Sequence, residues 1–258
     1  ALLSEQMNAA LFMNHPYRKP IIGWEHEIKN LNLDDVMNFY KKYYAPNNAV
    51  IVICGDVKLD EVVKIAKKYF GAIKSSKIEK RLWTIEPTQH APRKVLLNSK
   101  DTAIPVFKRH YLAPTYNKSK KESLALEVFT EIFGNPSTGM LFKEFVENKK
   151  IATSAAAYYY SDGFGDTSFT ISIIPKKGIN LEEIESQLDE YLNTIKKKLI
   201  NENDLQSVKE RLVNNTIFAQ DSLYMGMRIF GSSLTTGYSL KEITDWPKNI
   251  SKVSVNDV

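Results

Sequence analysis

The chain has 258 residues, a length that fits one large domain or two smaller ones. Hydrophobic residues make up 43% and charged residues 25%, as in an ordinary globular protein, and no apolar run approaches the roughly 18 residues of a membrane span. The net charge of +5 comes mainly from lysines spread along expected helices, not from the arginine- and aromatic-rich stripe of a nucleic-acid surface. We therefore expect no membrane span and no nucleic-acid partner.

The first 74 residues predict three helices and one strand. Residues 1–14 are rich in helix formers, and Asn32 is placed to cap a second helix that has acidic residues in its first turn. The apolar run at 49–54 predicts a strand, and it contains the single cysteine, Cys54, which excludes an internal disulfide. A third helix with apolar residues at 3.6-residue spacing ends at Gly71.

Residues 75–93 show no sustained periodicity and predict an interdomain linker. The part that follows alternates strands and helices. We expect strands near 94–100 and 105–113, helices near 119–133 and 139–150, a hairpin of 154–160 with 167–174, and a helix at 180–199 capped by Asn180. Two or three further helices extend to about residue 246.

Two segments of the chain match each other. Residues 28–36 and 250–258 agree in order, spacing and chemistry, and 250 minus 28 gives an offset of 222 residues. That offset is too long for a solenoid and suits a duplicated domain, although a chance match of nine positions is the alternative. We expect an α+β protein of duplicated two-layer α/β domains, each a mixed, largely antiparallel sheet with helices on one face, truncated at both ends.

Residues for a complete catalytic site are not apparent. A hydrolytic zinc site usually needs two histidines close in sequence on a helix, and the four here, His15, His26, His90 and His110, are never four apart. His15 precedes a proline and is expected in a turn, and His110 is expected on one face of a strand. Phosphate-binding loops and a nucleophile elbow are also lacking. We assign no catalytic, substrate-binding or metal residue.

Several blocks of this sequence resemble the pitrilysin/insulinase-type zinc peptidases, peptidase family M16, and in particular the short bacterial members related to processing peptidase. The blocks that carry the resemblance are residues 1–13, 15–24, 39–57, 68–71 and 139–153. The family is built from two similar domains, which agrees with the repeat. The resemblance implies that residues 1–74 form the C-terminal part of a first domain and that 94–258 form a second, non-zinc domain lacking its last elements.

The resemblance also implies where the chemistry lies. Family members bind zinc through a His-x-x-Glu-His helix and a later Glu, and these would all precede Ala1, so none is carried onto this chain and Glu5 is no substitute. Many members place an Arg and a Tyr seven residues apart in a non-zinc domain to bind substrate. The matching positions are Val146 and Thr153, which supply neither a cation nor a phenol.

The function implied is that of a fragment of a zinc metalloendopeptidase subunit that hydrolyses peptides. Zinc would be bound in the full-length parent and not in this chain, which alone is expected to be inactive. The expected partners are a peptide substrate and either a second family subunit carrying the Arg/Tyr pair or a second copy. The alternative is a non-catalytic scaffold subunit of the same fold, as in cytochrome reductase. The resemblance to bacterial members implies a bacterial protein, and its location, periplasmic or cytoplasmic, is unknown.

Overall fold

The computed structural model describes residues 1–79, 82, 84–102, 104–196 and 200–258. They form two compact units. The first contains residues 1–90 and 218–243, and the second contains 91–217 and 244–258. The division after His90 lies inside the expected linker, whereas residues 218–243, expected in the second domain, group with the first unit. That these units derive from two similar peptidase-like domains stays a prediction.

The first unit is helical in its described residues. Its helices are α1 (Leu2–Leu11), α2 (Glu25–Lys29), α3 (Leu33–Tyr43), α4 (Leu59–Phe70), α9 (Leu223–Thr235) and α10 (Leu240–Thr244), with short 3-10 turns η1 (Pro16–Arg18) and η2 (Pro46–Asn48). The predicted cap of α3 is confirmed, because Asn32 Oδ1 accepts from Asp35 N at 3.0 Å. Gly71 follows the last residue of α4, as expected.

Much of the apolar surface of the first unit is exposed. Phe39 on α3 is 57% exposed and Ile65 on α4 is 56% exposed, although both lie on the apolar stripes that predicted these helices. The prediction of a strand at 49–54 is wrong for the described chain, since this segment pairs with no other described residue. A strand depends on a partner to satisfy its backbone groups, so an apolar run alone does not produce one.

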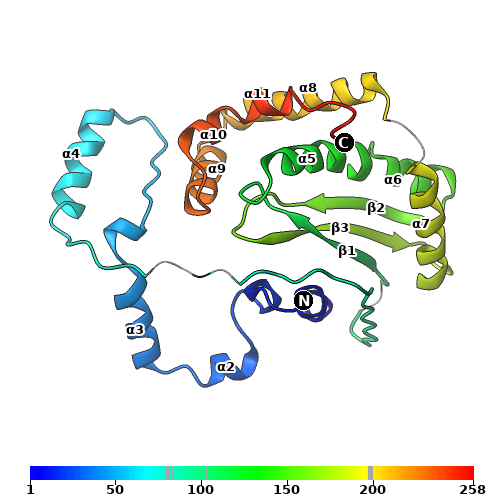
Figure 1. Cartoon of the computed structure of the whole chain (residues 1–258), viewed down its shortest axis with the longest axis horizontal. Helices are drawn as coiled ribbons and strands as arrows, with labels where there is room; N and C mark the ends of the chain where they lie inside the picture. The colour runs from blue at the N-terminus through cyan, green and yellow to red at the C-terminus, as the bar shows by residue number, and fades with distance from the viewer. Residues whose placement is uncertain (80–81, 83, 103, 197–199) are drawn as a thin grey trace. The chain divides into compact units, whose positions relative to one another are not determined.

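The second unit contains a three-stranded sheet. Strands β1 (Phe107–Pro114), β2 (Ala152–Tyr159) and β3 (Asp166–Pro175) lie in the order β1-β3-β2, and both pairings are antiparallel (Figure 1). The predicted hairpin is confirmed, but the described sheet is wholly antiparallel instead of mixed. The strand expected at 94–100 does not form, and Leu96 in this segment is 66% exposed.

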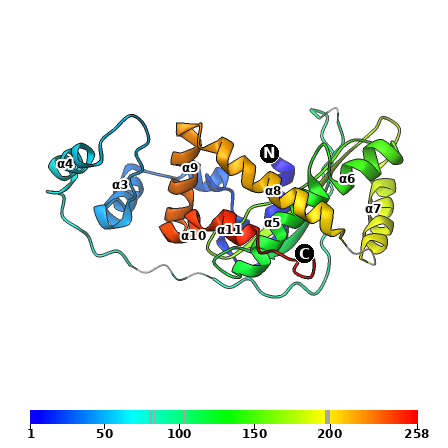
Figure 2. The ribbon, with the colours of Figure 1, turned by 90° about the horizontal axis from the view of Figure 1, so that it is seen from above.

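The described residues of the second unit also form helices (Figures 1 and 2). They are α5 (Lys120–Gly134), α6 (Met140–Phe142), α7 (Leu181–Ile195), α8 (Glu202–Ala219) and α11 (Trp246–Ile250), and α6 continues into a π-helical turn, η3 (Lys143–Asn148). The predicted Asn180 cap of α7 is confirmed by a 2.7 Å hydrogen bond that Glu183 N donates to Asn180 Oδ1. Leu199, the last expected residue of that helix, lies outside the described residues.

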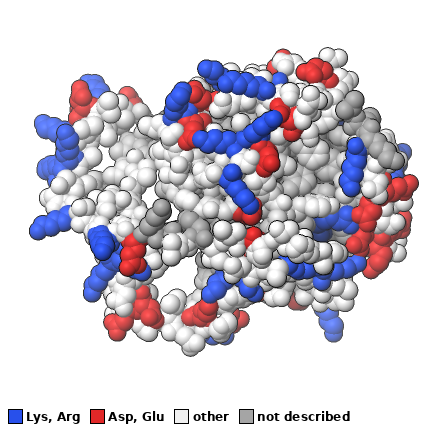
Figure 3. All heavy atoms as spheres, viewed as in Figure 1, with Lys and Arg blue, Asp and Glu red and all other residues white. Residues whose placement is uncertain are grey.

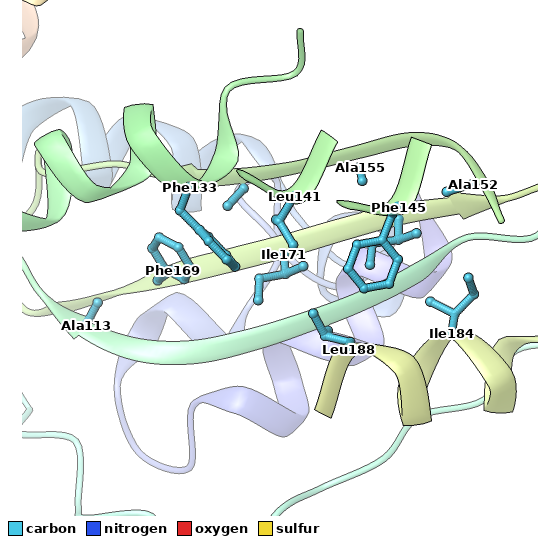
Figure 4. Packing of buried hydrophobic residues seen from close by; sticks show 12 residues of the cluster. Ala113, Phe133, Leu141, Phe145, Ala152, Ala155, Phe169, Ile171, Ile184 and Leu188 are labelled. Atoms are coloured by element: carbon cyan, nitrogen blue, oxygen red, sulfur yellow. The ribbon is translucent and has the colours of Figure 1, made fainter. Parts of the chain in front are cut away.

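The core lies between the sheet and α5, α6, η3 and α7. The alternation of β3 places Phe169, Ile171 and Ile173 on this side, where they meet fully buried residues of the helices (Figure 4); those residues are Phe133, Leu141, Phe145, Ile184 and Leu188. A Cβ at Gly134 would lie 2.4 Å from Ala157 Cβ, so glycine allows α5 to approach β2 closely. This arrangement confirms an α+β domain of sheet and helices.

Candidate functional site

The four histidines of the chain lie in unrelated settings. His15 precedes η1 as expected of a turn residue, and its Nδ1 accepts from Tyr17 N at 3.3 Å. His110 lies on β1, 3.1 Å from Thr170 Oγ1, and burial with nearby Lys108 lowers its pKa to about 4. His26 and His90 are exposed. Among the described residues, His, Cys, Asp and Glu form no group of three able to hold a metal ion.

The two positions that match the Arg/Tyr pair of the resembling family also lack that chemistry. Val146 lies in η3 and packs against the core. Thr153 lies at the bulge of β2, and its hydroxyl donates to the Ile174 carbonyl at 3.3 Å. Lys149, a neighbouring cation, is engaged with Glu144 at 3.4 Å and with Gln187 at 2.6 Å. Val146 therefore contributes to the packing of the core, and Thr153 contributes to the geometry of the bulge in β2.

Glu86, within the expected linker, binds a turn of the first unit. Its carboxylate accepts backbone N–H bonds from Met13 at 2.6 Å, Asn14 at 2.9 Å and His15 at 2.8 Å. Burial opposes its ionisation, but the three donors outweigh that effect and lower the pKa of Glu86. No local sequence pattern indicated this contact, because the partners lie about seventy residues apart.

The second unit contains a cavity of about 310 Å³ beside α5. Most of the residues that line it carry a polar group, and they are Glu127, Thr130, Glu131, Tyr159, Tyr160, Ser161, Asp162 and Leu212. Glu127 Oε2 accepts a hydrogen bond from Trp246 Nε1 at 2.8 Å. Burial and the negative charge of Asp162 raise the pKa of Glu127 to about 7.

Two further groups of this lining are held by their neighbours. Glu131 Oε1 accepts from Arg211 Nε at 2.8 Å, which balances its charge. The hydroxyl of Tyr159 donates to the Pro114 carbonyl and lies 2.9 Å from Ser123 Oγ. Burial raises the pKa of Tyr159 to about 12, so this phenol is neutral at physiological pH.

From the sequence we assigned no functional residue, so the surroundings of Glu127 were not expected. Glu127 follows the buried Leu124 by three residues and precedes the buried Val128, so it lies at the edge of the apolar stripe of α5. That spacing was the available signal. Trp246, its partner, lies 119 residues away along the chain, and only the fold brings the two side chains together.

Charged side chains are interspersed on the face shown in Figure 3, where lysines and arginines lie among acidic residues. Acidic side chains gather over α7, which carries Glu182, Glu183, Glu185, Asp189 and Glu190. Arg109 of β1 pairs with Asp189 and lies 3.8 Å from Glu185. None of the helices that the structure describes combines the length and the apolar character needed to cross a membrane.

The sequence profile described as "Peptidase M16 inactive domain" matches residues 30–212. The chain belongs to the M16 peptidase family. The zinc protease PqqE of Helicobacter pylori is 23% identical over 250 residues, covering 96% of this chain and 55% of that protein. The non-peptidase homolog YmxG of the same species is 25% identical over 266 residues, covering 96% and 59%. The chain thus spans about half the length of the curated relatives it matches.

Solved structures share the fold. A protease from H. pylori has a TM-score of 0.86 at 22% identity, covering 99% of this chain and 66% of that one. The periplasmic protease PqqL of Escherichia coli has a TM-score of 0.73 at 16% identity, covering 99% and 29%. A chain of complex III2 from Candida albicans has a TM-score of 0.75 at 14% identity, covering 99% and 61%. The M16 fold therefore occurs in two proteases and in a chain of complex III2.

Proposed function

We propose that this chain is the non-catalytic part of an M16 zinc metalloendopeptidase subunit whose full-length form hydrolyses peptides. The observation that carries the proposal is the match of the inactive-domain profile to residues 30–212. The possible metal ligands of the described residues agree with this proposal, because the histidines lie apart from one another and therefore do not fit a zinc site within this chain. In the full-length protein, zinc held by residues outside this chain would activate the attacking water.

We further propose that residues 1–74 belong to a first peptidase-like domain and 94–258 to a second one. The two copies of the repeat support this division. Ile250 and Val253 are 0% and 6% exposed in the second copy, whereas Ile28 and Leu31 at the same repeat positions are 38% and 58% exposed. The same apolar sequence thus has a packing surface in one unit and lacks one in the other, as expected if further residues of the parent cover it.

A partner subunit is part of the proposal. Val146 and Thr153 cannot bind a substrate backbone as a cation and a phenol would, so a second family subunit that carries this pair, or a second copy of the parent, would complete the site. The resemblance to a chain of complex III2 supports assembly, as does a 29% identical, 72-residue match to the probable mitochondrial-processing peptidase subunit beta of Schizosaccharomyces pombe. One bacterial protein of this fold, PqqL of Escherichia coli, is a periplasmic protease, and a periplasmic and a cytoplasmic location are both consistent with the proposal.

The test compares this chain with its full-length parent. We expect the parent to contain one tightly bound zinc per chain and to cleave a long unstructured peptide in a chelator-sensitive manner. The chain of 258 residues should bind zinc no better than an exposed histidine does and should show no such cleavage. A stoichiometric, tight zinc site in this chain, measured by equilibrium dialysis at micromolar zinc, would falsify the proposal.

The second candidate is a scaffold subunit without peptidase activity. The specific observation in its favour is the 25% identity to the non-peptidase homolog YmxG, which spans 96% of this chain. The same measurements separate the two candidates. A full-length parent that binds no zinc and cleaves no peptide, alone or with its co-purifying subunit, would establish the scaffold.

A further inference from the structure

The expected linker, residues 75–93, contacts the first unit through groups of different strength. Lys42 Nζ lies 3.0 Å from Glu79 Oε2, but the Glu79 side chain is 71% exposed, and such surface ion pairs stabilise little. Glu86 differs, because it is only 8% exposed and its carboxylate accepts hydrogen bonds from three consecutive backbone amides. Glu86 is therefore better placed than Glu79 to hold the linker on the first unit.

The three donors belong to one turn and converge on one point. Met13, Asn14 and His15 lie between the end of α1 and the start of η1, and their N–H groups bond the same carboxylate at 2.6, 2.9 and 2.8 Å. Successive amides in a turn form a concave anion-binding site, called a nest. The Asn14 side chain adds a contact, because its Nδ2 donates to the Ile85 carbonyl at 3.3 Å. The turn therefore binds both the carboxylate and the backbone that carries it.

Contacts within the turn fix the shape of this nest independently of the carboxylate. Arg18 Nη1 donates to the Met13 carbonyl at 2.8 Å, which orients the peptide group whose N–H points at the carboxylate. The His15 side chain is buried, and its ring centroid lies 4.3 Å from that of Tyr17. Since these contacts do not involve the linker, we expect the nest to keep its form when Glu86 is removed.

Charge favours a carboxylate over a neutral group in this nest. Burial opposes the ionisation of Glu86, but the three backbone N–H groups, with a smaller contribution from His15, outweigh that effect and lower its pKa. A hydrogen bond to an ionised acceptor is roughly twice as strong as one between neutral groups. The same three donors should therefore bind a carboxylate more tightly than an amide.

We propose that the turn at residues 13–15 is a carboxylate-binding nest and that Glu86 is its built-in ligand, which straps the linker to the first unit. Occupied by Glu86, the nest holds residues 85 and 86 on the turn. Without the Glu86 carboxylate, the nest binds another carboxylate from solution, because its three donors keep their geometry. The strap does not depend on the proposed peptidase function.

The test removes the Glu86 carboxylate and returns it as a free ion. Glu86→Ala deletes a methylene and a carboxylate, which acetate replaces. In ¹H–¹⁵N spectra of the complete 258-residue chain, sodium acetate should shift the amides of residues 13–15 of this variant saturably toward their wild-type positions. The same amides of the wild type should not respond, because Glu86 occupies the nest. Acetamide, a neutral molecule of similar shape, and sodium chloride at equal ionic strength should cause no such shift.

The strap itself is measured by amide hydrogen exchange at residues 13–15 and by the ¹⁵N order parameters of residues 85 and 86. Glu86→Ala should raise the exchange about tenfold or more, because hydrogen bonds to a charged acceptor are lost, and should lower the order parameters. Saturating acetate should restore the exchange but not the order of the linker, since acetate is not attached to it. Glu79→Ala, in the same linker, is the matched control and should change neither quantity.

A second variant and a wild-type measurement keep the result decisive if Glu86→Ala disturbs the fold. Glu86→Gln keeps the size and one acceptor oxygen, so it should raise exchange less than Glu86→Ala does. In the wild type, the ¹³Cδ resonance of Glu86 should titrate below pH 4.5, and a midpoint at or above 4.5 overturns the proposal. So does the absence of an acetate shift at residues 13–15, an equal shift with acetamide or chloride, or unchanged order at residues 85 and 86 in Glu86→Ala.

Discussion

Glu127→Gln should change the pH dependence of the stability of the second unit. The pKa of Glu127 is raised from 4.5 to about 7, so the folded state keeps the proton that the unfolded state releases as the pH rises. A carboxyl with a raised pKa contributes stability that is complete below pH 4.5 and is lost as the pH rises through about 7. Since one pKa unit corresponds to about 1.4 kcal/mol, the shift represents at most about 3 kcal/mol.

The measured loss should be smaller because Glu127 lines a cavity that admits water. We expect the wild-type free energy of unfolding to fall by about 2 kcal/mol more than that of Glu127→Gln between pH 5 and pH 8. Gln keeps the shape and still accepts the Trp246 hydrogen bond, so the comparison isolates the charge. The assay is urea unfolding at each pH followed by the fluorescence of Trp246 in a background with Trp24→Phe and Trp83→Phe, with Glu122→Gln as control. Parallel pH profiles for wild type and Glu127→Gln would refute the reasoning.

Three further predictions concern local structure and packing. Lys150 has a φ of 56°, a left-handed conformation that glycine adopts more readily than lysine. Lys150→Gly should therefore raise the free energy of unfolding, measured by chemical denaturation, by about 1 kcal/mol, and the control Lys143→Gly in η3 should lower it by about as much. Ile184→Ala should cost about 2–5 kcal/mol because the side chain is fully buried, while Ile65→Ala, at 56% exposure, should change the melting of the isolated chain by less than about 0.5 kcal/mol. Glu86→Gln should increase amide hydrogen exchange at residues 13–15, whose backbone N–H groups Glu86 binds, most clearly above pH 4.5 where the wild-type carboxylate is charged. Equal exchange in both proteins would contradict this prediction and show that neutral hydrogen bonds suffice.

Local signals in the sequence determined much of the secondary structure. Asn32 and Asn180 were recognisable as helix caps because a capping side chain bonds an amide only three residues away. The β2–β3 hairpin was equally accessible, since its two strands are close in sequence and alternate apolar and polar residues. The resemblance to the M16 family assigned its Arg/Tyr positions to Val146 and Thr153, and that assignment stays a prediction.

Only the tertiary structure decided which apolar runs become strands and which carboxyls are buried. Residues 49–54 and 94–100 have strand-like composition, yet neither forms a ladder in the described chain, because a strand requires a partner that its own sequence does not specify. The sequence places Glu127 at the edge of the apolar stripe of α5 but does not specify its partners. Its pKa is raised by burial and by the charge of Asp162, against the hydrogen bonds of Ser161 and Trp246, and such contacts between distant parts of the chain are set by the packing of whole elements.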